Sequence, residues 1–254
     1  MIQARMGSTR LAGKVLSEIL GKPMLQLQVE RLRCARHIAK IVLATTEAPA
    51  DDAVALLGER IGLPVFRGSE NDVLDRYYQA ALFVKASHIM RLTADCPLID
   101  PEICDRVAEE YIRTNCDYVL TGESFAEGLD CELISFSALE ASWKEAKLKS
   151  EREHVTLFVR NHPERFNLQV LENDVNDAHI RITVDEPEDL IVVRIIFDHF
   201  RNNPIDFGIA EIRAFLASHA EVAKLNSAVI RNAGLAKSLT DDRKQSETDK
   251  GIGW

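Results

Sequence analysis

Short apolar runs alternate with longer stretches of helical spacing over the first half of the chain. Three runs rich in apolar and β-branched residues, at positions 41–45, 64–66 and 88–93, predict strands. The stretches that follow them, at positions 51–61, 72–85 and 101–113, predict helices. Because each strand is followed by a helix, the pattern predicts an α/β fold with a mostly parallel sheet covered by helices.

The pattern continues near the carboxyl-terminal third of the chain. An apolar run at positions 180–184 predicts another strand, and Pro187 opens a helix with Leu190, Val193 and Phe197 on one face. Between positions 121 and 165 the rhythm changes to a loop, a strand at 130–136 and helices at 138–147 and 151–161. We interpret 121–165 as an α+β insertion for dimerisation or substrate binding, within a single domain spanning 1–236.

The last residues of the chain differ from this domain. Positions 237–254 are polar and show no apolar periodicity, so they predict a frayed tail. The five cysteines are odd in number and form no C-x-x-C pair, which argues against disulfides and a structural zinc site. We therefore expect a cytoplasmic protein, and no segment is apolar enough to predict a membrane span.

Charge is unevenly distributed along the 254 residues. The net charge of −9 argues against a nucleic-acid or anionic membrane surface, since phosphate backbones demand a basic footprint. Positions 1–40, however, hold eight Lys/Arg and two acidic residues, a net of +6. A local basic segment in an acidic protein suits a small anion better than a polymer.

The first candidate site lies in this basic segment, from Gln3 to Lys14. A strand is followed by Gly7, whose freedom lets backbone N–H groups turn toward a bound anion, and by the cations Arg10 and Lys14. The segment can hold a triphosphate, although it is not a Walker A loop, because Val15 stands where a magnesium-binding Ser or Thr belongs. A glycine turn followed by a solvated basic face fits the same pattern.

Two further candidates are carboxylates at strand ends. Asp95 precedes Pro97 after the strand at 88–93, and Asp185 precedes Pro187 after the strand at 180–184. Ligands bind at the carboxyl edge of open α/β sheets, so the two carboxylates and the basic loop could converge on one phosphate-bound Mg²⁺. A turn aspartate and a helix cap are the structural alternatives.

Six motifs in order identify a family resemblance. The strings are IQARMGSTRLAGKVL, VFRGSENDVLDRYYQAA, RLTADCPLIDPE, GLDCE, EREHVT and ITVDEPEDL. Together they resemble the SpsF-type spore-coat polysaccharide cytidylyltransferases and, more distantly, the 3-deoxy-manno-octulosonate and acylneuraminate cytidylyltransferases. The match runs from about Ile2 to Phe200.

The resemblance implies a Rossmann-like nucleotidyltransferase that activates an acidic, 2-keto-3-deoxy type sugar as its CMP derivative for surface polysaccharide biosynthesis. CTP is then the donor, pyrophosphate leaves, Mg²⁺ is the cofactor and a homodimer is the expected assembly. Two alternatives stay open. The chain could be a weakened or inactive nucleotide-binding homologue, or it could use another base or a neutral sugar.

The resemblance also assigns residues to roles. It places Arg10, Lys14 and Asp95 in catalysis and the metal on Asp95 and Asp185. Nucleotide-binding residues in the phosphate loop are Ala4, Arg5, Gly7, Ser8, Arg10 and Lys14, and those near the base are Arg67, Gly68 and Asp72. Substrate-binding residues near the sugar are Asp130, Arg152, Glu153 and His154.

The chain departs from the family pattern at two places. Ala12 stands where relatives have proline, which loosens the loop between Arg10 and Lys14. Relatives also begin their first strand several residues earlier, whereas this sequence begins at Met1. A central strand of about three residues leaves backbone groups of its neighbours unpaired, so we expect either an upstream start or a weakened member of the family.

Overall fold

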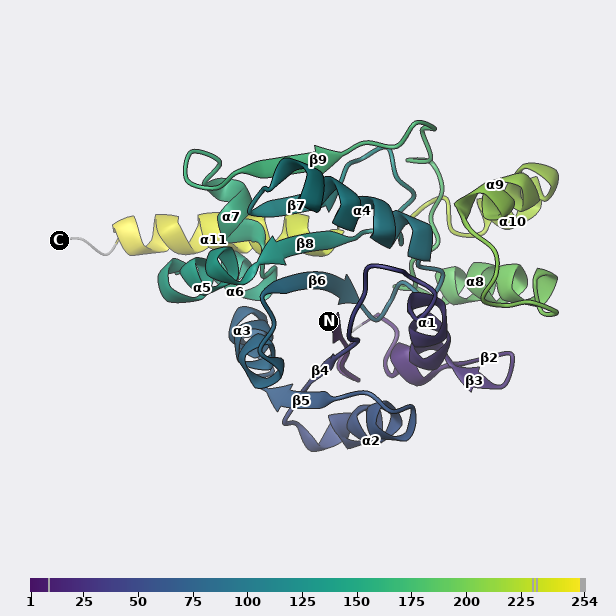
Figure 1. Ribbon diagram of the computed structural model, residues 1–254, viewed down its shortest axis with the longest axis horizontal. Helices are drawn as coiled ribbons and strands as arrows, with labels where there is room; N and C mark the ends of the chain where they lie inside the picture. Colours follow the sequence, from purple (N-terminus) through teal and green to yellow (C-terminus); the bar gives the residue numbers. More distant parts are fainter. Residues whose placement is uncertain (9, 230, 232, 252–254) are drawn as a thin grey trace.

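The computed structural model describes residues 1–8, 10–229, 231 and 233–251. Seven strands form one sheet in the order β5-β4-β1-β6-β8-β7-β9 (Figure 1). Among the described strands of this sheet, β8 alone runs antiparallel to its neighbours. The sheet strands are β1 (Ile2–Gln3), β4 (Leu43–Thr46), β5 (Val65–Gly68), β6 (His88–Thr93), β7 (Tyr118–Thr121), β8 (Glu132–Ser135) and β9 (Leu168–Leu171). The predicted mostly parallel α/β sheet is confirmed.

Helices connect and cover these strands. The α-helices are α1 (Met24–Leu32), α2 (Asp52–Arg60), α3 (Val73–Val84), α4 (Pro101–Thr114), α5 (Phe136–Glu145), α6 (Lys149–Glu153), α7 (Leu157–Asn161), α8 (Pro187–His199), α9 (Ile209–Ser218), α10 (Ala220–Lys224) and α11 (Ala233–Gly251). Two 3₁₀ turns, η1 (Lys14–Leu16) and η2 (Pro49–Asp51), and a small hairpin of β2 (Glu18–Ile19) and β3 (Lys22–Pro23) complete the fold.

Alternating side chains of the sheet feed two separate cores. Val119 and Leu133 pack in one core with residues of α1, α2 and α4. Their sequence neighbours Tyr118 and Ile134 pack in another core with residues of α3, α5 and α7. Because successive strand residues point to opposite faces, helices cover both faces of the sheet. The helices leave uncovered the sheet edge where the parallel strands have their carboxyl ends, and a ligand site can form there.

The short first strand lies in the middle of the sheet. Ile2 pairs with Leu43 of β4 on one side and with Leu92 of β6 on the other. The pairing continues to Ala4, whose N–H donates to the carbonyl of Ala44 at 3.2 Å. β1 therefore delivers the residues that follow it to the carboxyl edge of the sheet.

Most predicted elements are present with small shifts in their ends, and two differ in kind. The predicted helix at 151–161 is divided into α6 and α7 by a turn in which Val155 has a φ of 48°. The predicted strand at 180–184 forms a single bridge, between Arg181 and Glu127. This segment crosses the edge of the sheet as a loop, because its polar atoms pair with the segments at Glu127 and Asp95 and with no full strand.

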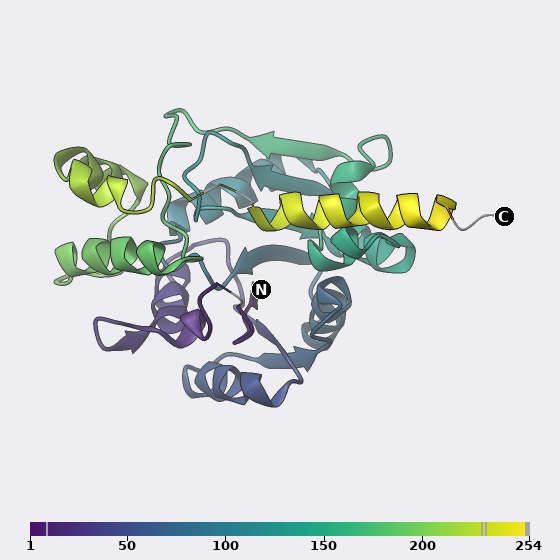
Figure 2. The same cartoon turned by 180° about the vertical axis from the view of Figure 1, so that it is seen from behind.

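The predicted insertion and tail are both packed on the domain. The strand expected at 130–136 is β8, which lies between β6 and β7 in the main sheet. The prediction of a frayed tail at 237–254 was wrong for residues 237–251, which belong to α11, and residues 252–254 lie outside the described residues. Figure 2 shows α11 crossing the molecule beside α6. Polar contacts hold the helix there, including Ser150 N–H to Asp242 Oδ1 at 3.3 Å, so apolar periodicity gives no sign of it.

Within the described residues, no helix is long and apolar enough to cross a membrane.

Candidate active site

Two adjoining cavities open at the carboxyl ends of β1 and β6. The first, the loop cavity, has a volume of about 590 Å³ and lies against residues 3–15. The second, the acidic cavity, has a volume of about 500 Å³ and lies against residues 120–132. The residues that line both are Arg10, Arg91, Thr93, Asp95, His154, Asp185 and Gly234. A molecule in one cavity therefore meets a molecule in the other at Asp95 and Asp185.

The loop that follows β1 is folded back on itself. Gly13, at a φ of 69°, donates its N–H to the carbonyl of Met6 at 3.1 Å. Buried Asp51 accepts a hydrogen bond from Met6 N–H at 2.6 Å and another from the Thr46 hydroxyl. The sequence analysis missed Asp51, which fixes the start of the loop from the end of η2. All six predicted loop residues line the loop cavity: Ala4, Arg5, Gly7, Ser8, Arg10 and Lys14.

Lys14 is the buried cation of this loop, with 8% of its surface exposed. Its Nζ lies 3.3 Å from Asp95 Oδ2, 2.9 Å from Asp185 Oδ1 and 2.6 Å from the carbonyl of Val184. Burial lowers the pKa of Lys14, but Asp95 and Asp185 outweigh burial and leave this pKa raised. Burial likewise raises the pKa of Asp95, and Lys14 outweighs it, leaving that pKa lowered. The ammonium and the Asp95 carboxylate therefore stay charged at neutral pH.

Backbone contacts bring the two predicted metal ligands together. Val184 N–H donates to the carbonyl of Asp95 at 2.8 Å, and the Thr183 hydroxyl donates to the same carbonyl at 3.2 Å. The side chain of Asp185 does not cap α8, since Asp189 accepts the N–H groups of Asp185 and Glu186, each at 2.9 Å. The helix-capping alternative thus applies to Asp189, and Asp185 is left facing Lys14.

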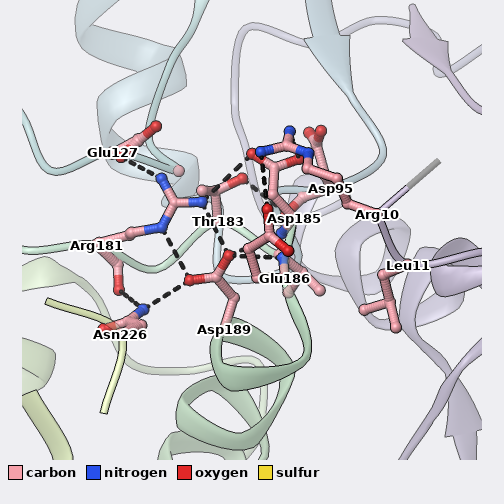
Figure 3. Close-up of polar contacts among 12 residues, drawn as sticks. Arg10, Leu11, Asp95, Glu127, Arg181, Thr183, Asp185, Glu186, Asp189 and Asn226 are labelled. Atoms are coloured by element: carbon pink, nitrogen blue, oxygen red, sulfur yellow. Dashed lines mark hydrogen bonds and ion pairs between the residues drawn. The ribbon is translucent and has the colours of Figure 1, made fainter. Parts of the chain in front are cut away.

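A buried cluster supports Asp185 from behind (Figure 3). Arg181 lies 2.8 Å from Asp189 and 3.3 Å from Asp185, and it pairs with Glu127 at 2.5 Å. Asn226 donates to Asp189 Oδ1 at 2.8 Å. Sequence reasoning missed this cluster. One signal was available, because an acidic residue at the third position after a helix start often accepts the N–H of the capping residue.

The donor set fits a divalent cation that arrives with a phosphate group. Among the described residues, no group of three or more His, Cys, Asp or Glu side chains could hold a metal ion. Asp95 and Asp185 nonetheless face a common point, where the Lys14 ammonium already lies. Mg²⁺ favours one or two carboxylates and takes its other ligands from phosphate oxygens and water. Asp95 and Asp185 are the residues that would hold it.

Four predicted residues lie away from both cavities. Arg67 donates to the carbonyl of Thr46 at 2.9 Å and pairs with Asp52 at 2.7 Å, and Gly68 pairs with Thr46 in the sheet. Asp72 caps α3 by accepting Asp75 N–H at 2.9 Å, and its carboxylate also pairs with Arg152 at 3.0 Å. None of these four is among the residues described as lining either cavity. Their roles toward base and sugar stay predictions.

Buried polar groups of other residues face the loop cavity instead. Arg76, on α3, is 2% exposed and lines the cavity, and its Nε has no hydrogen-bond partner in the described part of the chain. Gln3 also lines the cavity with an unpaired Oε1. Burial lowers the pKa of Arg76. Both residues were missed, since their direction depends on how β1 and α3 pack.

The other predicted sugar residues line the cavities. Glu153 lines the loop cavity, Asp130 lines the acidic cavity, and His154 lines both. Gly128 shapes this region, because its φ is 110° and an added Cβ would lie 2.5 Å from Thr183 N. Its N–H donates to Asp130 Oδ2 at 3.0 Å. Burial raises the pKa of Asp130.

Several known sequences are similar to this chain. A family model described as "Cytidylyltransferase" matches residues 1–237. Uncharacterized protein MJ1063 of Methanocaldococcus jannaschii is 38% identical over 231 residues, which cover 90% of this chain and 94% of the relative. The spore coat polysaccharide biosynthesis protein SpsF of Bacillus subtilis is 33% identical over 237 residues, which cover 88% of this chain and 95% of the relative.

Solved structures show the same fold. A cytidylyltransferase from Leptospira borgpetersenii superposes with a TM-score of 0.84 at 31% identity, covering 91% of this chain and 97% of the other. A CMP:2-keto-3-deoxy-manno-octonic acid synthetase complexed with CTP superposes with a TM-score of 0.60 at 18% identity, covering 78% of this chain and 97% of the other. The second likeness shows the fold alone.

Proposed function

We propose that this chain, which belongs to the cytidylyltransferase family, transfers CMP from CTP to a hydroxyl of an acidic sugar with release of pyrophosphate. Family membership makes it a CTP-using nucleotidyltransferase. The acidic acceptor, the metal and the residue roles are the proposed part. The meeting of two cavities at Asp95 and Asp185 is the observation that supports it most strongly.

In this proposal CTP lies in the loop cavity, with its triphosphate against residues 5–14. Arg10 and Lys14 neutralise charge on the β- and γ-phosphates that leave, and the loop N–H groups orient them. Asp95 and Asp185 would hold Mg²⁺, which when bound reduces the negative charge on the phosphates. Lys14 must then exchange its carboxylate partners for phosphate oxygens, so nucleotide binding and a shift of the Lys14 side chain are coupled.

The acceptor sugar lies in the acidic cavity. Arg160 lines this cavity and makes no ion pair with a described residue, so its guanidinium is available to a carboxylate on the sugar. Arg231 lines the same cavity and donates to the carbonyl of Phe125 at 3.1 Å. The synthetase of 2-keto-3-deoxy-manno-octonic acid that shares the fold gives the acceptor class a precedent. The SpsF relative suggests surface polysaccharide as the destination of the product.

One observation favours a second candidate, a neutral or amino sugar. Five acidic side chains line the acidic cavity away from the junction: Glu123, Glu127, Asp130, Glu132 and Glu172. Glu132 and Glu127 are neutralised by Arg91 at 3.1 Å and Arg181 at 2.5 Å. Asp130 lies farther from its cation, at 3.8 Å from Arg231. A hydroxyl or ammonium group of a sugar could therefore bind to Asp130.

The test measures pyrophosphate release with CTP, ATP, GTP and UTP across keto-sugar acids, neutral sugars and amino sugars. The proposal predicts release with CTP and a sugar acid, which Arg160→Gln weakens through a raised KM for the acceptor. Release with neutral or amino sugars only would select the second candidate. Nucleotide binding without release from any pair would identify an inactive homologue.

A further inference from the structure

His154 lines both cavities, as Asp95 and Asp185 do. It occupies the break between α6 and α7, where Val155 has a φ of 48°. The backbone N–H of His154 donates to the carbonyl of Ser150 at 2.8 Å. This hydrogen bond closes the last turn of α6. The ring is thus held by an irregular turn at the junction of the two cavities.

α11 supplies a partner for one ring nitrogen. His154 Nε2 lies 3.0 Å from Ser238 Oγ, and α11 packs against α6. The Ser238 hydroxyl has one proton and two acceptors, Glu153 Oε2 at 3.0 Å and the carbonyl of Gly234 at 3.1 Å. We assign the proton between Nε2 and Ser238 to the imidazole, because the serine hydroxyl can then donate to Glu153 or Gly234, which only accept.

This assignment leaves Nδ1 of His154 as an unprotonated acceptor. Nδ1 has no hydrogen-bond partner among the residues that the structure describes. It is also not one of the fully buried polar atoms that lack a partner in these residues. Burial lowers the pKa of His154. Glu153 and Glu132 face the ring and oppose this shift, whereas Arg91 and Arg160 add to it. The imidazole is therefore neutral at pH 7, with Nδ1 able to take a proton.

We propose that His154 is the general base of the transfer and that Ser238 is the positioning residue that fixes its tautomer. In the step, the acceptor hydroxyl oxygen forms a bond to the α-phosphorus of CTP, and its proton passes to His154 Nδ1. The bond from the α-phosphorus to the bridging oxygen breaks, and its electron pair leaves with pyrophosphate. The imidazolium then gives its proton to water. This inference rests on the proposed function and adds a base to it.

A ligand-free test examines the tautomer directly. Protein with ¹⁵N-labelled histidine gives long-range ¹H–¹⁵N spectra, and His154→Gln identifies the His154 signals. We expect an Nε2–H tautomer titrating below pH 6.5 in the wild type and in Ser238→Thr, and a mixture of tautomers in Ser238→Ala. An Nδ1–H tautomer in the wild type would overturn the proposal. Thr240→Ala, on the same helix, is the matched control, because its hydroxyl donates only to the carbonyl of Ala236 among described residues.

A kinetic test uses CTP and 3-deoxy-manno-octulosonate as the probe pair. His154→Gln should lower kcat about 10²- to 10⁴-fold with little change in the KM for CTP, and it should remove the acidic limb of the pH profile. Ser238→Ala should move that limb, and Ser238→Thr should restore it. Thermal melting checks folding, with His154→Asn as the second variant. If a folded His154 variant turns over at the wild-type rate, the role of His154 as general base is overturned and the proposed function is not. If the wild type releases no pyrophosphate with any acceptor in the panel, the proposed function is overturned as well.

Discussion

Lys14 Nζ lies 2.9 Å from Asp185 Oδ1, at the point where the carboxylate also faces Asp95. A cation thus lies between the two carboxylates that the family resemblance assigns to a metal. In the proposed function, Mg²⁺ held by Asp95 and Asp185 would compete with the Lys14 ammonium for this place. Charge exchange at Lys14 is therefore expected to accompany nucleotide binding.

Replacing Lys14 should affect both activity and the response to metal. Lys14→Ala should lower turnover about 10²- to 10³-fold, the usual effect of losing one charge-stabilising group. It should also lower the melting temperature at low Mg²⁺, since Asp95 and Asp185 then repel each other, and Mg²⁺ should raise it more than in the wild type. Melting curves with and without Mg²⁺ test this. Lys22→Ala, which removes the pair with Glu30 outside the cavities, is the control. Equal Mg²⁺ responses would mean that no shared cation site exists.

Asp95→Asn should remove magnesium-dependent turnover while the protein stays folded. The pKa of Asp95 is lowered in the folded state. The Asp95 carboxylate therefore contributes to stability above about pH 4, and this contribution is lost as the pH falls through the pKa of the folded state. Asp95→Asn should lack this part of the loss of stability at low pH. Denaturation at pH 3 to 7 compares the two proteins. If Asp95→Asn unfolds at pH 7 instead, the residue is structural.

Asp185 and Asp189 offer a matched pair that separates chemistry from support. Asp185→Asn should abolish turnover with a small change in stability. Asp189 is fully buried against Arg181 and Asn226, so Asp189→Asn should cost about 3 kcal/mol of unfolding free energy by weakening a buried ion pair. Urea unfolding and turnover are measured on both. A stable, active Asp189→Asn protein would contradict the supporting role.

The amino group of Met1 predicts a pH dependence for the 254-residue chain. It donates to the carbonyl of Met90 at 2.6 Å, and burial lowers its pKa to about 6 from an ordinary value near 8. Between these values the unfolded chain binds more protons, so stability should rise from pH 6 to pH 8 by about 2 kcal/mol. Chemical denaturation across this range checks the slope.

A cavity beside Met1 provides the companion experiment. It has a volume of about 410 Å³ and is lined largely by apolar residues between β4 and β6, including Ile38, Val42 and Leu133. An added segment of four to six apolar residues before Met1 should fill it, raise the melting temperature and CTP affinity, and remove the pH slope. A Gly/Ser segment of equal length should remove the pH dependence of stability without raising the melting temperature or the CTP affinity. Unchanged melting with the apolar segment would show that the added residues do not fill this cavity.

The sequence predicted the sheet and the loop better than the surroundings of the site. Alternating apolar runs gave β6 with its observed ends and placed Asp95 at the carboxyl edge of the sheet. Asp185 was expected at the same edge after a strand, but the segment before it is a loop that reaches this edge through its contacts with Glu127 and Asp95. Arg181 and Ser238 were missed, since their partners Glu127 and His154 are distant in sequence. Arg76 was missed because its direction depends on how α3 packs against the sheet. A polar helix such as α11, held by a few side-chain contacts, leaves no apolar period to detect.

The most direct test of the account follows the α-phosphate of CTP. The wild type is incubated with Mg²⁺, 3-deoxy-manno-octulosonate and CTP labelled at the α-phosphorus, beside Asp95→Asn. The account predicts label in a CMP–sugar product, an equal amount of unlabelled pyrophosphate and no product from the variant. Label that stays in CTP with every sugar acid of the panel, or product formed equally well by Asp95→Asn, would contradict it.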